Sequence, residues 1–191
     1  KIMFKFTVIT PTLNSENGIL RCIKSVFDEN YENYEHIIID GGSTDDTIKI
    51  IERNLYNKVK LINAKGSSIY SAINIGIKNT TGDIISILGS SDYYNTSYRF
   101  KFLNDLFKRM NTDIIYGDVA YFSRSNQNKI IRKYKSDKFT KDNIAWGFMP
   151  AHQSMFIKKK IYDLAGKYDE SYKIAGDYEF IARIYNSLEF K

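Results

Sequence analysis

Strand-like and helix-like segments alternate along the first half of the chain, and this order restricts the fold more than any other feature. Runs rich in β-branched and apolar residues predict strands at 4–10, 34–40, 59–62 and 84–88, the first of them stopped by Pro11. Apolar residues at helical spacing predict helices at 19–27 and 69–77, and a further helix that Ser43 caps and that buries Ile48, Ile51 and Leu55. The apolar run at 37–39 suits a strand that is covered on both faces. We therefore expect an α/β fold with a mainly parallel central sheet flanked by helices.

The second half has a different pattern. Leu103, Leu106, Phe107 and Met110 predict a helix, and segments 114–122 and 129–135 predict a small antiparallel hairpin around a polar turn. An aromatic loop at 146–150 precedes a predicted strand at 153–157, and helical patterns follow at 161–165 and 178–188. No internal repeat or linker separates the two halves, so we expect a single domain.

Charge and cysteine content exclude some classes of protein. The net charge of +6 attracts anions in general. The basic residues are dispersed apart from clusters at 129–138 and 158–160, whereas a nucleic-acid-binding protein concentrates them on one face, so we expect no nucleic-acid partner. The lone Cys22 lies among apolar residues, which indicates a buried side chain and a reducing compartment. No apolar run approaches the roughly 18 residues of a membrane-spanning helix, so the prediction is a cytoplasmic protein.

Small, polar and acidic residues follow three of the predicted strands. The segments are Thr10-Pro11-Thr12-Leu13-Asn14, Asp40-Gly41-Gly42-Ser43-Thr44-Asp45 and Gly89-Ser90-Ser91-Asp92. In a parallel sheet these strand ends meet at one rim, where open α/β sheets bind their ligands. A carboxylate such as Asp92 is a hard oxygen ligand of the kind that a divalent cation on a diphosphate prefers. The same residues also suit turns by geometry alone.

These segments resemble family 2 glycosyltransferases, which have the GT-A fold. The likeness covers essentially the whole chain in order, through 8–14, 38–47, 69–76, 81–85, 152–154 and 175–180, and the segment at 40–45 is the most specific part. It is strongest to bacterial members that build surface polysaccharides. The resemblance implies one GT-A domain at 1–191, with a nucleotide-binding half at 1–92 and an acceptor-side half at 93–191, and it leaves open a truncation at the C-terminus.

The resemblance also implies roles for individual residues. Pro11, Thr12 and Asn14 would line the nucleoside pocket, and Asp40 would bind the base, typically uracil. Gly42 and Ser91 are also expected to bind the substrate. Asp92 matches the last aspartate of the acidic motif that holds Mg²⁺ or Mn²⁺ on the donor diphosphate. Asp177 matches the catalytic base of inverting members, and His152 and Gln153 border the same cleft. The implied partners are a nucleotide-sugar donor and a glycan or lipid-linked acceptor, and a lipid-linked acceptor would bring the protein to the inner face of the membrane. Residues 158–160 are expected to be the solvated start of a helix. If the acceptor is carried on a membrane lipid, these lysines would have a second use at the membrane.

Departures from the family pattern leave alternatives open. Ser91 and Ser71 stand where aspartates are usual, so a non-catalytic nucleotide- or glycan-binding module remains a rival to the enzyme. A sugar nucleotidyltransferase is a second rival, but the segment 12–17 lacks the Lys or Arg of a phosphate-binding loop. At the start of a helix, Asp177 would also serve as a simple cap. His36 is expected to be structural, and Trp146 either stacks on an acceptor sugar or anchors its loop.

Overall fold

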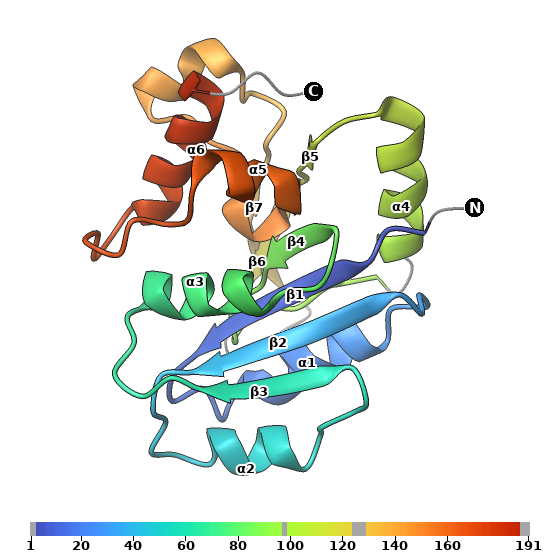
Figure 1. The fold of residues 1–191 in the computed structure, drawn as a ribbon, viewed down its shortest axis with the longest axis vertical. Coiled ribbons are helices and arrows are strands. Elements are labelled where there is room, and N and C mark those ends of the chain that lie inside the picture. Colours follow the sequence, from blue (N-terminus) through green and yellow to red (C-terminus); the bar gives the residue numbers. More distant parts are fainter. Residues whose placement is uncertain (1–2, 97–98, 124–128, 188–191) are drawn as a thin grey trace.

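The computed structural model describes residues 3–96, 99–123 and 129–187. Within them, a six-stranded sheet has the order β3-β2-β1-β4-β8-β5. Its strands are β1 (Phe6–Thr12), β2 (Tyr34–Asp40), β3 (Val59–Asn63), β4 (Ile84–Ile87), β5 (Ile114–Ile115) and β8 (Phe156–Lys158). Strands β1 to β4 pair in parallel, and β8 pairs antiparallel with both β4 and β5. The expected mainly parallel α/β sheet is confirmed (Figure 1).

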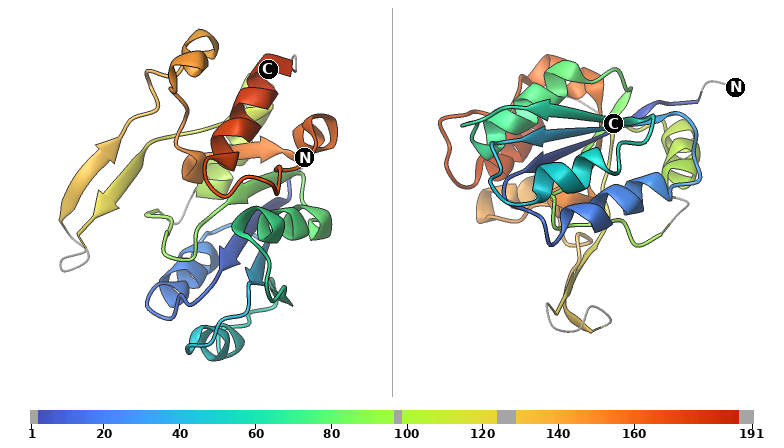
Figure 2. Two further views of the ribbon diagram at one scale, coloured as in Figure 1. Left: turned by 90° about the vertical axis from the view of Figure 1, so that its left-hand side faces the viewer. Right: turned by 90° about the horizontal axis from the view of Figure 1, so that it is seen from below.

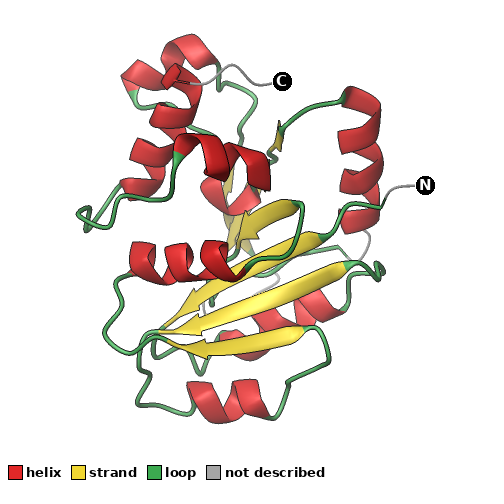
Figure 3. Cartoon of the chain, in the orientation of Figure 1, coloured by secondary structure: helices red, strands yellow, loops and turns green. Residues whose placement is uncertain are grey.

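Helices cover both faces of this sheet (Figure 3). They are α1 (Ile19–Phe27), α2 (Thr47–Glu52), α3 (Ile69–Asn79), α4 (Arg99–Met110), α5 (Lys159–Ala165) and α6 (Gly176–Ser187), with 3₁₀ turns at η1 (Lys141–Trp146) and η2 (His152–Ser154). No helix in the described part of the chain is both long and apolar enough to cross a lipid bilayer.

The apolar run of β2 faces both cores, as the sequence indicates. Ile37 and Ile39 pack in a cluster with residues of α3, α5 and α6, whereas Ile38 packs with α1 and α2 on the opposite face. All three isoleucines have no exposed surface. Because side chains alternate along a strand, a run of apolar residues is required wherever both faces are covered.

A separate two-stranded sheet is formed by β6 (Val119–Phe122) and β7 (Ile130–Tyr134), and it stands away from the body of the molecule (Figure 2). The predicted hairpin is therefore confirmed, but its first strand is shorter than expected. Ile114 and Ile115 belong to the main sheet instead. The chain changes direction at Gly117, whose N–H donates to Ser154 Oγ and whose carbonyl accepts from Ser136 and Ser154, so no continuous strand passes through it.

The first strand continues through Pro11, which was expected to stop it. The N–H of Leu88 donates to the carbonyl of Ile9, so odd-numbered residues of β1 turn their backbone groups towards β4. Pairing with β4 ends at the pair of Ile9 and Ile87. Pro11 therefore lies beyond the partner strand, and its missing N–H removes no hydrogen bond from the sheet.

Three local predictions are corrected: the start of α2, the start of β8 and the surroundings of the first residues of α5. Helix α2 begins at Thr47, with Asp46 rather than Ser43 at its N-cap position, and Leu55 is 48% exposed. The last strand of the main sheet begins at Phe156 because residues 152–154 form the η2 turn. The expected solvated start of α5 is in part an ion-pair site, because Lys158 and Lys160 both contact Asp113 Oδ1, at 3.1 and 2.7 Å.

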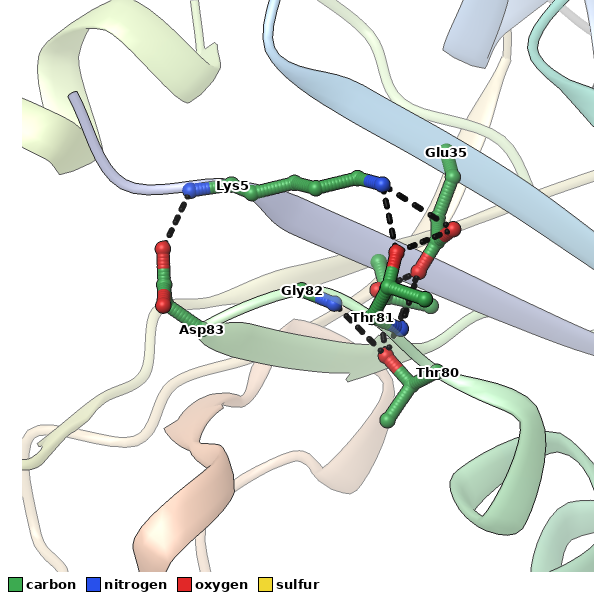
Figure 4. Close-up of polar contacts among 7 residues, drawn as sticks. Lys5, Glu35, Thr80, Thr81, Gly82 and Asp83 are labelled. Carbon is green, nitrogen blue, oxygen red and sulfur yellow. Dashed lines mark hydrogen bonds and ion pairs between the residues drawn. The ribbon is translucent and has the colours of Figure 1, made fainter.

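Glu35 organises a polar cluster at the amino-terminal edge of the sheet (Figure 4). Its carboxylate accepts from the hydroxyl of Thr7 at 2.7 Å, from the backbone N–H of Thr81 at 2.7 Å and from Lys5 Nζ at 3.2 Å. Burial acts to raise the pKa of Glu35, but these hydrogen bonds outweigh it and the pKa is lowered. The cluster joins β1, β2 and the turn before β4 at the edge remote from the strand ends that hold the predicted site.

Candidate active site

The loops after β1, β2 and β4 are joined to one another by hydrogen bonds. The N–H of Asn14 donates to Ser43 Oγ at 2.9 Å, and Asn14 Oδ1 accepts from the N–H of Thr44 at 2.8 Å. Ser15 Oγ lies 2.7 Å from Ser90 Oγ, which links the first loop to the third. Asn14 adopts a left-handed backbone (φ 48°), a conformation that asparagine tolerates better than most residues. The carboxyl ends of three strands therefore form one connected rim, as the sequence predicts.

Asp40 lies at the end of β2 and is 1% exposed. Its Oδ2 accepts from the backbone N–H groups of Gly42 and Ser43, at 2.8 and 2.9 Å, and its Oδ1 accepts from the Ser43 hydroxyl at 2.5 Å. The carboxylate therefore anchors the loop that follows it. Binding of a nucleotide base by Asp40 stays a prediction, and the structure adds that Asp40 fixes the conformation of the loop that follows it.

The remaining predicted nucleoside-binding residues lie around this loop. Gly42 has a φ of 105°, which favours glycine, and a Cβ there would lie 2.9 Å from Lys65 Cγ. Pro11 is half-buried and Thr12 is buried. Among the described residues, the buried hydroxyls of Thr12 and Ser67 find no hydrogen-bond partner in the protein. Buried polar atoms are nearly always paired, so this corner has hydrogen-bonding capacity that water or a ligand can meet.

Asp92 lies on the loop after β4, beside the exposed Ser91. The N–H of Asp92 donates to the Gly89 carbonyl at 2.9 Å, and its carboxylate packs so closely on Gly89 that a Cβ there would lie 2.7 Å from Oδ2. Partial desolvation raises the pKa of Asp92, and the positive charges of His152 and Arg21 act against that rise.

Asp177 lies in the first turn of α6 and is held by two side chains. His152 Nδ1 is 2.9 Å from Oδ2, and the hydroxyl of Tyr70 donates to Oδ1 at 3.4 Å. The same hydroxyl accepts the N–H of Gly176 at 2.8 Å, and a Cβ on Gly176 would lie 2.8 Å from the Tyr70 ring. The hydrogen bond from His152 is the main cause of a lowered pKa for Asp177, with further contributions from backbone N–H groups at the helix start. The carboxylate is therefore ionised at neutral pH and fixed in direction.

His152 connects Asp177 with Asp92. It contacts Asp177 directly, and its electrostatic interaction with Asp92 opposes the rise that desolvation causes in the pKa of Asp92. Gln153 is half-buried on the same η2 turn. The structure thus brings His152 and Asp177 into contact and places Asp92 within electrostatic range of His152. Asp40 lies further along the rim, and the loop contacts of Ser43, Asn14, Ser15 and Ser90 connect its loop with the loop that carries Asp92.

Two residues of this site were not predicted as functional. Tyr70 lies in a segment of the family likeness, but nothing in its local sequence indicates a contact with a residue more than 100 positions later. Arg21 projects from α1 towards the Asp92 loop and stacks over the ring of Tyr93, with its guanidinium carbon 4.2 Å from the ring centre. Its helical position alone predicts a solvent-exposed cation, so no sequence signal distinguishes it.

A mainly parallel sheet that ends in three connected polar loops, with an antiparallel strand beside β4, agrees with the GT-A fold that the sequence predicts. The sequence profile described as Glycosyl transferase family 2 matches residues 7–164, and the chain belongs to that family. The chain is 26% identical over 186 residues to a PGL/p-HBAD biosynthesis glycosyltransferase of Mycobacterium tuberculosis, covering 95% of this chain and 70% of that protein. It is 38% identical over 94 residues to a dolichyl N-acetyl-alpha-D-glucosaminyl phosphate 3-beta-D-2,3-diacetamido-2,3-dideoxy-beta-D-glucuronosyltransferase of Methanococcus voltae, covering 46% of this chain and 29% of that one.

Solved structures have the same fold. Residues 1–349 of Staphylococcus aureus TarS in complex with UDP superpose with a TM-score of 0.77 at 21% identity, covering 95% of this chain and 55% of that one. The chain therefore spans about half the length of that structure. At this identity the likeness establishes the fold.

Proposed function

We propose that this domain transfers a sugar from a nucleoside-diphosphate sugar, most simply a UDP-sugar, to a hydroxyl group of a glycan or lipid-linked acceptor, with inversion at the anomeric carbon. The observation that supports it best is the ionised Asp177, fixed by His152 beside the Asp92 loop. The TarS complex with UDP supports the choice of donor, and the dolichyl phosphate acceptor in the name of the Methanococcus voltae relative supports a lipid-linked acceptor.

Asp177 is the general base of this proposal. An acceptor hydroxyl that lies against Asp177 gives its proton to the carboxylate while its oxygen attacks the anomeric carbon. The bond from that carbon to the diphosphate oxygen breaks at the same time, and the electron pair leaves with the nucleoside diphosphate. Attack on the face opposite the leaving group inverts the anomeric centre. The lowered pKa keeps Asp177 ready to accept the proton at neutral pH.

The residues fit a divalent cation that arrives with the donor. Among the residues that the structure describes, no group of three or more His, Cys, Asp and Glu side chains is placed to hold an ion. Asp92 supplies one carboxylate, and Mg²⁺ in nucleotide sites usually takes one or two carboxylates together with phosphate oxygens and water. When bound there, Mg²⁺ or Mn²⁺ would stabilise negative charge on the departing diphosphate. The exposed hydroxyl of Ser91 lies next to the same loop position.

The test is a comparison of binding and turnover in the wild type and in Asp177→Asn. Isothermal titration of UDP with and without Mn²⁺ measures binding, and UDP release from a panel of UDP-sugars with acceptor glycans measures turnover. The proposal expects Mn²⁺-dependent UDP binding in both proteins and loss of about 10²–10⁴ in turnover only in the variant. Equal turnover in both proteins would refute the role of Asp177.

A non-catalytic nucleotide-binding domain is the second candidate, and the serine at position 91 is the observation in its favour. It predicts Mn²⁺-dependent UDP binding by the wild type without release of UDP from any donor of the panel. The two candidates are therefore separated by the same pair of measurements.

A further inference from the structure

The β6–β7 hairpin, residues 119–122 and 130–134, stands apart from the body of the molecule in both views of Figure 2. At its inner face the ring of Phe122 lies 5.8 Å from that of Tyr93, and at its base the hydroxyl of Tyr134 donates to the Met149 carbonyl at 2.7 Å. A two-stranded hairpin has little stability of its own in water. Its outer surface is therefore a candidate for contact with a partner.

Exposed apolar and cationic residues lie next to one another along this hairpin. Away from its base, Tyr121, Ile130 and Ile131 are 40%, 45% and 63% exposed. Arg132, which pairs with Tyr121 across the hairpin, and Lys133 follow Ile131 along β7 and are also exposed. The guanidinium carbon of Arg132 lies 5.7 Å from the centre of the Tyr121 ring, so the cation extends alongside the aromatic residue.

The charge of the hairpin is of one sign. The sequence has no Asp or Glu between 119 and 135. The exposed cations are Lys129, Arg132, Lys133 and Lys135. None of them forms an ion pair with a residue that the structure describes, in contrast to the pairing of Lys158 and Lys160 with Asp113. A cationic surface without internal counter-charges attracts anionic partners.

We propose that the hairpin docks this domain on an anionic lipid surface, with Ile130 and Ile131 entering the membrane interface and Arg132 and Lys133 contacting lipid phosphates. Exposed aliphatic residues next to a tyrosine and a set of cations are the combination that binds such interfaces. A second copy of the chain is a weaker partner because two such hairpins repel each other by charge. Binding to lipid is independent of the glycosyl transfer proposed above.

The position of the hairpin gives this contact a use. Phe122 packs on Tyr93, which directly follows the candidate metal ligand Asp92. A membrane that holds the hairpin therefore lies close to the rim where the donor is proposed to bind.

Vesicle co-sedimentation of the purified chain without nucleotide or sugar tests the proposal. The chain is expected to bind vesicles with about one-third phosphatidylglycerol and to bind phosphatidylcholine vesicles at least tenfold more weakly, with the difference shrinking as salt is raised. Each cation near a charged membrane strengthens binding by about fivefold, so Arg132→Gln with Lys133→Gln should weaken it by roughly 25-fold. Ile130→Ser with Ile131→Ser should weaken binding to phosphatidylglycerol vesicles by at least tenfold through loss of apolar burial.

The control is Lys101→Gln with Phe102→Ser on α4, a double variant that removes one exposed cation and one exposed apolar side chain away from the hairpin. It should bind as the wild type does, and circular dichroism should show that all variants remain folded. Equal binding to both lipid compositions, or weaker binding by the α4 control but not by the hairpin variants, would overturn the proposal. The proposal would also be overturned if the wild type were a dimer on analytical ultracentrifugation and the hairpin variants lost the dimer but kept vesicle binding. Because no donor is present, a failure here is distinct from a failure of the proposed transferase activity.

Discussion

Replacing His152 by alanine removes the strongest constraint on Asp177. The contact of 2.9 Å between Nδ1 and Oδ2 is a hydrogen bond to a charged group, which in proteins contributes about 1.5–3 kcal/mol. The side chains of His152 and Asp177 are 39% and 25% exposed, so solvent screening reduces this to roughly 1–1.5 kcal/mol. If that energy serves to hold the base in position, kcat should fall roughly five- to tenfold while KM for the donor changes little.

The pH dependence supplies a readout that general loss of structure would not give. His152 lowers the pKa of Asp177, so its removal lets that pKa rise towards the ordinary aspartate value. A base must be ionised to act, and the acidic limb of the kcat profile should therefore move to higher pH in His152→Ala. In His152→Asn, the side-chain amide nitrogen can donate from nearly the position of Nδ1, and both kcat and the acidic limb should return towards those of the wild type.

Steady-state kinetics of UDP release between pH 4 and 9, on the wild type and the two variants, makes the measurement. A variant His152→Ala with unchanged kcat and an unchanged acidic limb would refute the positioning role. A rise in KM for the donor at constant kcat would instead assign His152 to donor binding.

Three further outcomes are expected. Asp92→Ala should abolish the Mn²⁺-dependent gain in UDP affinity in calorimetry without affecting metal-free binding, and Ser91→Asp should increase that gain. An Asp92→Ala variant that keeps the Mn²⁺ effect would exclude Asp92 as a metal ligand. Glu35→Gln should lower the free energy of unfolding at pH 7 by about 1 kcal/mol, because it weakens the hydrogen bonds to a charged acceptor. Since the folded-state pKa of Glu35 is lowered, this contribution exists above the unfolded-state pKa and disappears as the pH falls through the folded-state value, so urea unfolding curves of the two proteins should converge in acid. Gly82→Ala would place a Cβ 2.3 Å from Thr7 Oγ1 and 2.9 Å from the Lys5 carbonyl, and overpacking of roughly 2 kcal/mol should lower Tm by about 4–8 °C; an unchanged Tm would show that this turn can relax.

The strands and helices of the central sheet could be predicted because burial imposes a period on the sequence. Strand β2 was predicted at the residues where it lies, since its isoleucines must fill two cores at once. Pro11 was interpreted wrongly because its effect depends on how far the neighbouring strand extends. The interruption at Gly117 was missed for a similar reason, since Ser136 and Ser154 supply its hydrogen bonds from distant parts of the chain.

The site was predictable in composition but not in contacts. The polar loops after β1, β2 and β4 could be expected on one rim from topology alone. The pairing of His152 with Asp177 and the hydrogen bond from Gly176 to Tyr70 depend on how the start of α6 lies against η2 and α3, which no local pattern encodes. The inward-facing carboxylate of Asp40 is likewise decided by backbone N–H groups that only the folded loop presents.

The backbone immediately before α6 stores energy. Ala175 has a φ of 64°, a left-handed conformation that costs a residue with a Cβ about 1 kcal/mol. Glycine at this position would relieve the cost in the folded state but would also give the preceding loop, 169–174, more freedom. The chain therefore loses some free energy of folding at Ala175, and in return the direction of α6 is fixed. Selection for heat resistance alone is therefore expected to replace Ala175 early. The replacement would leave the direction of the Asp177 carboxylate less well fixed.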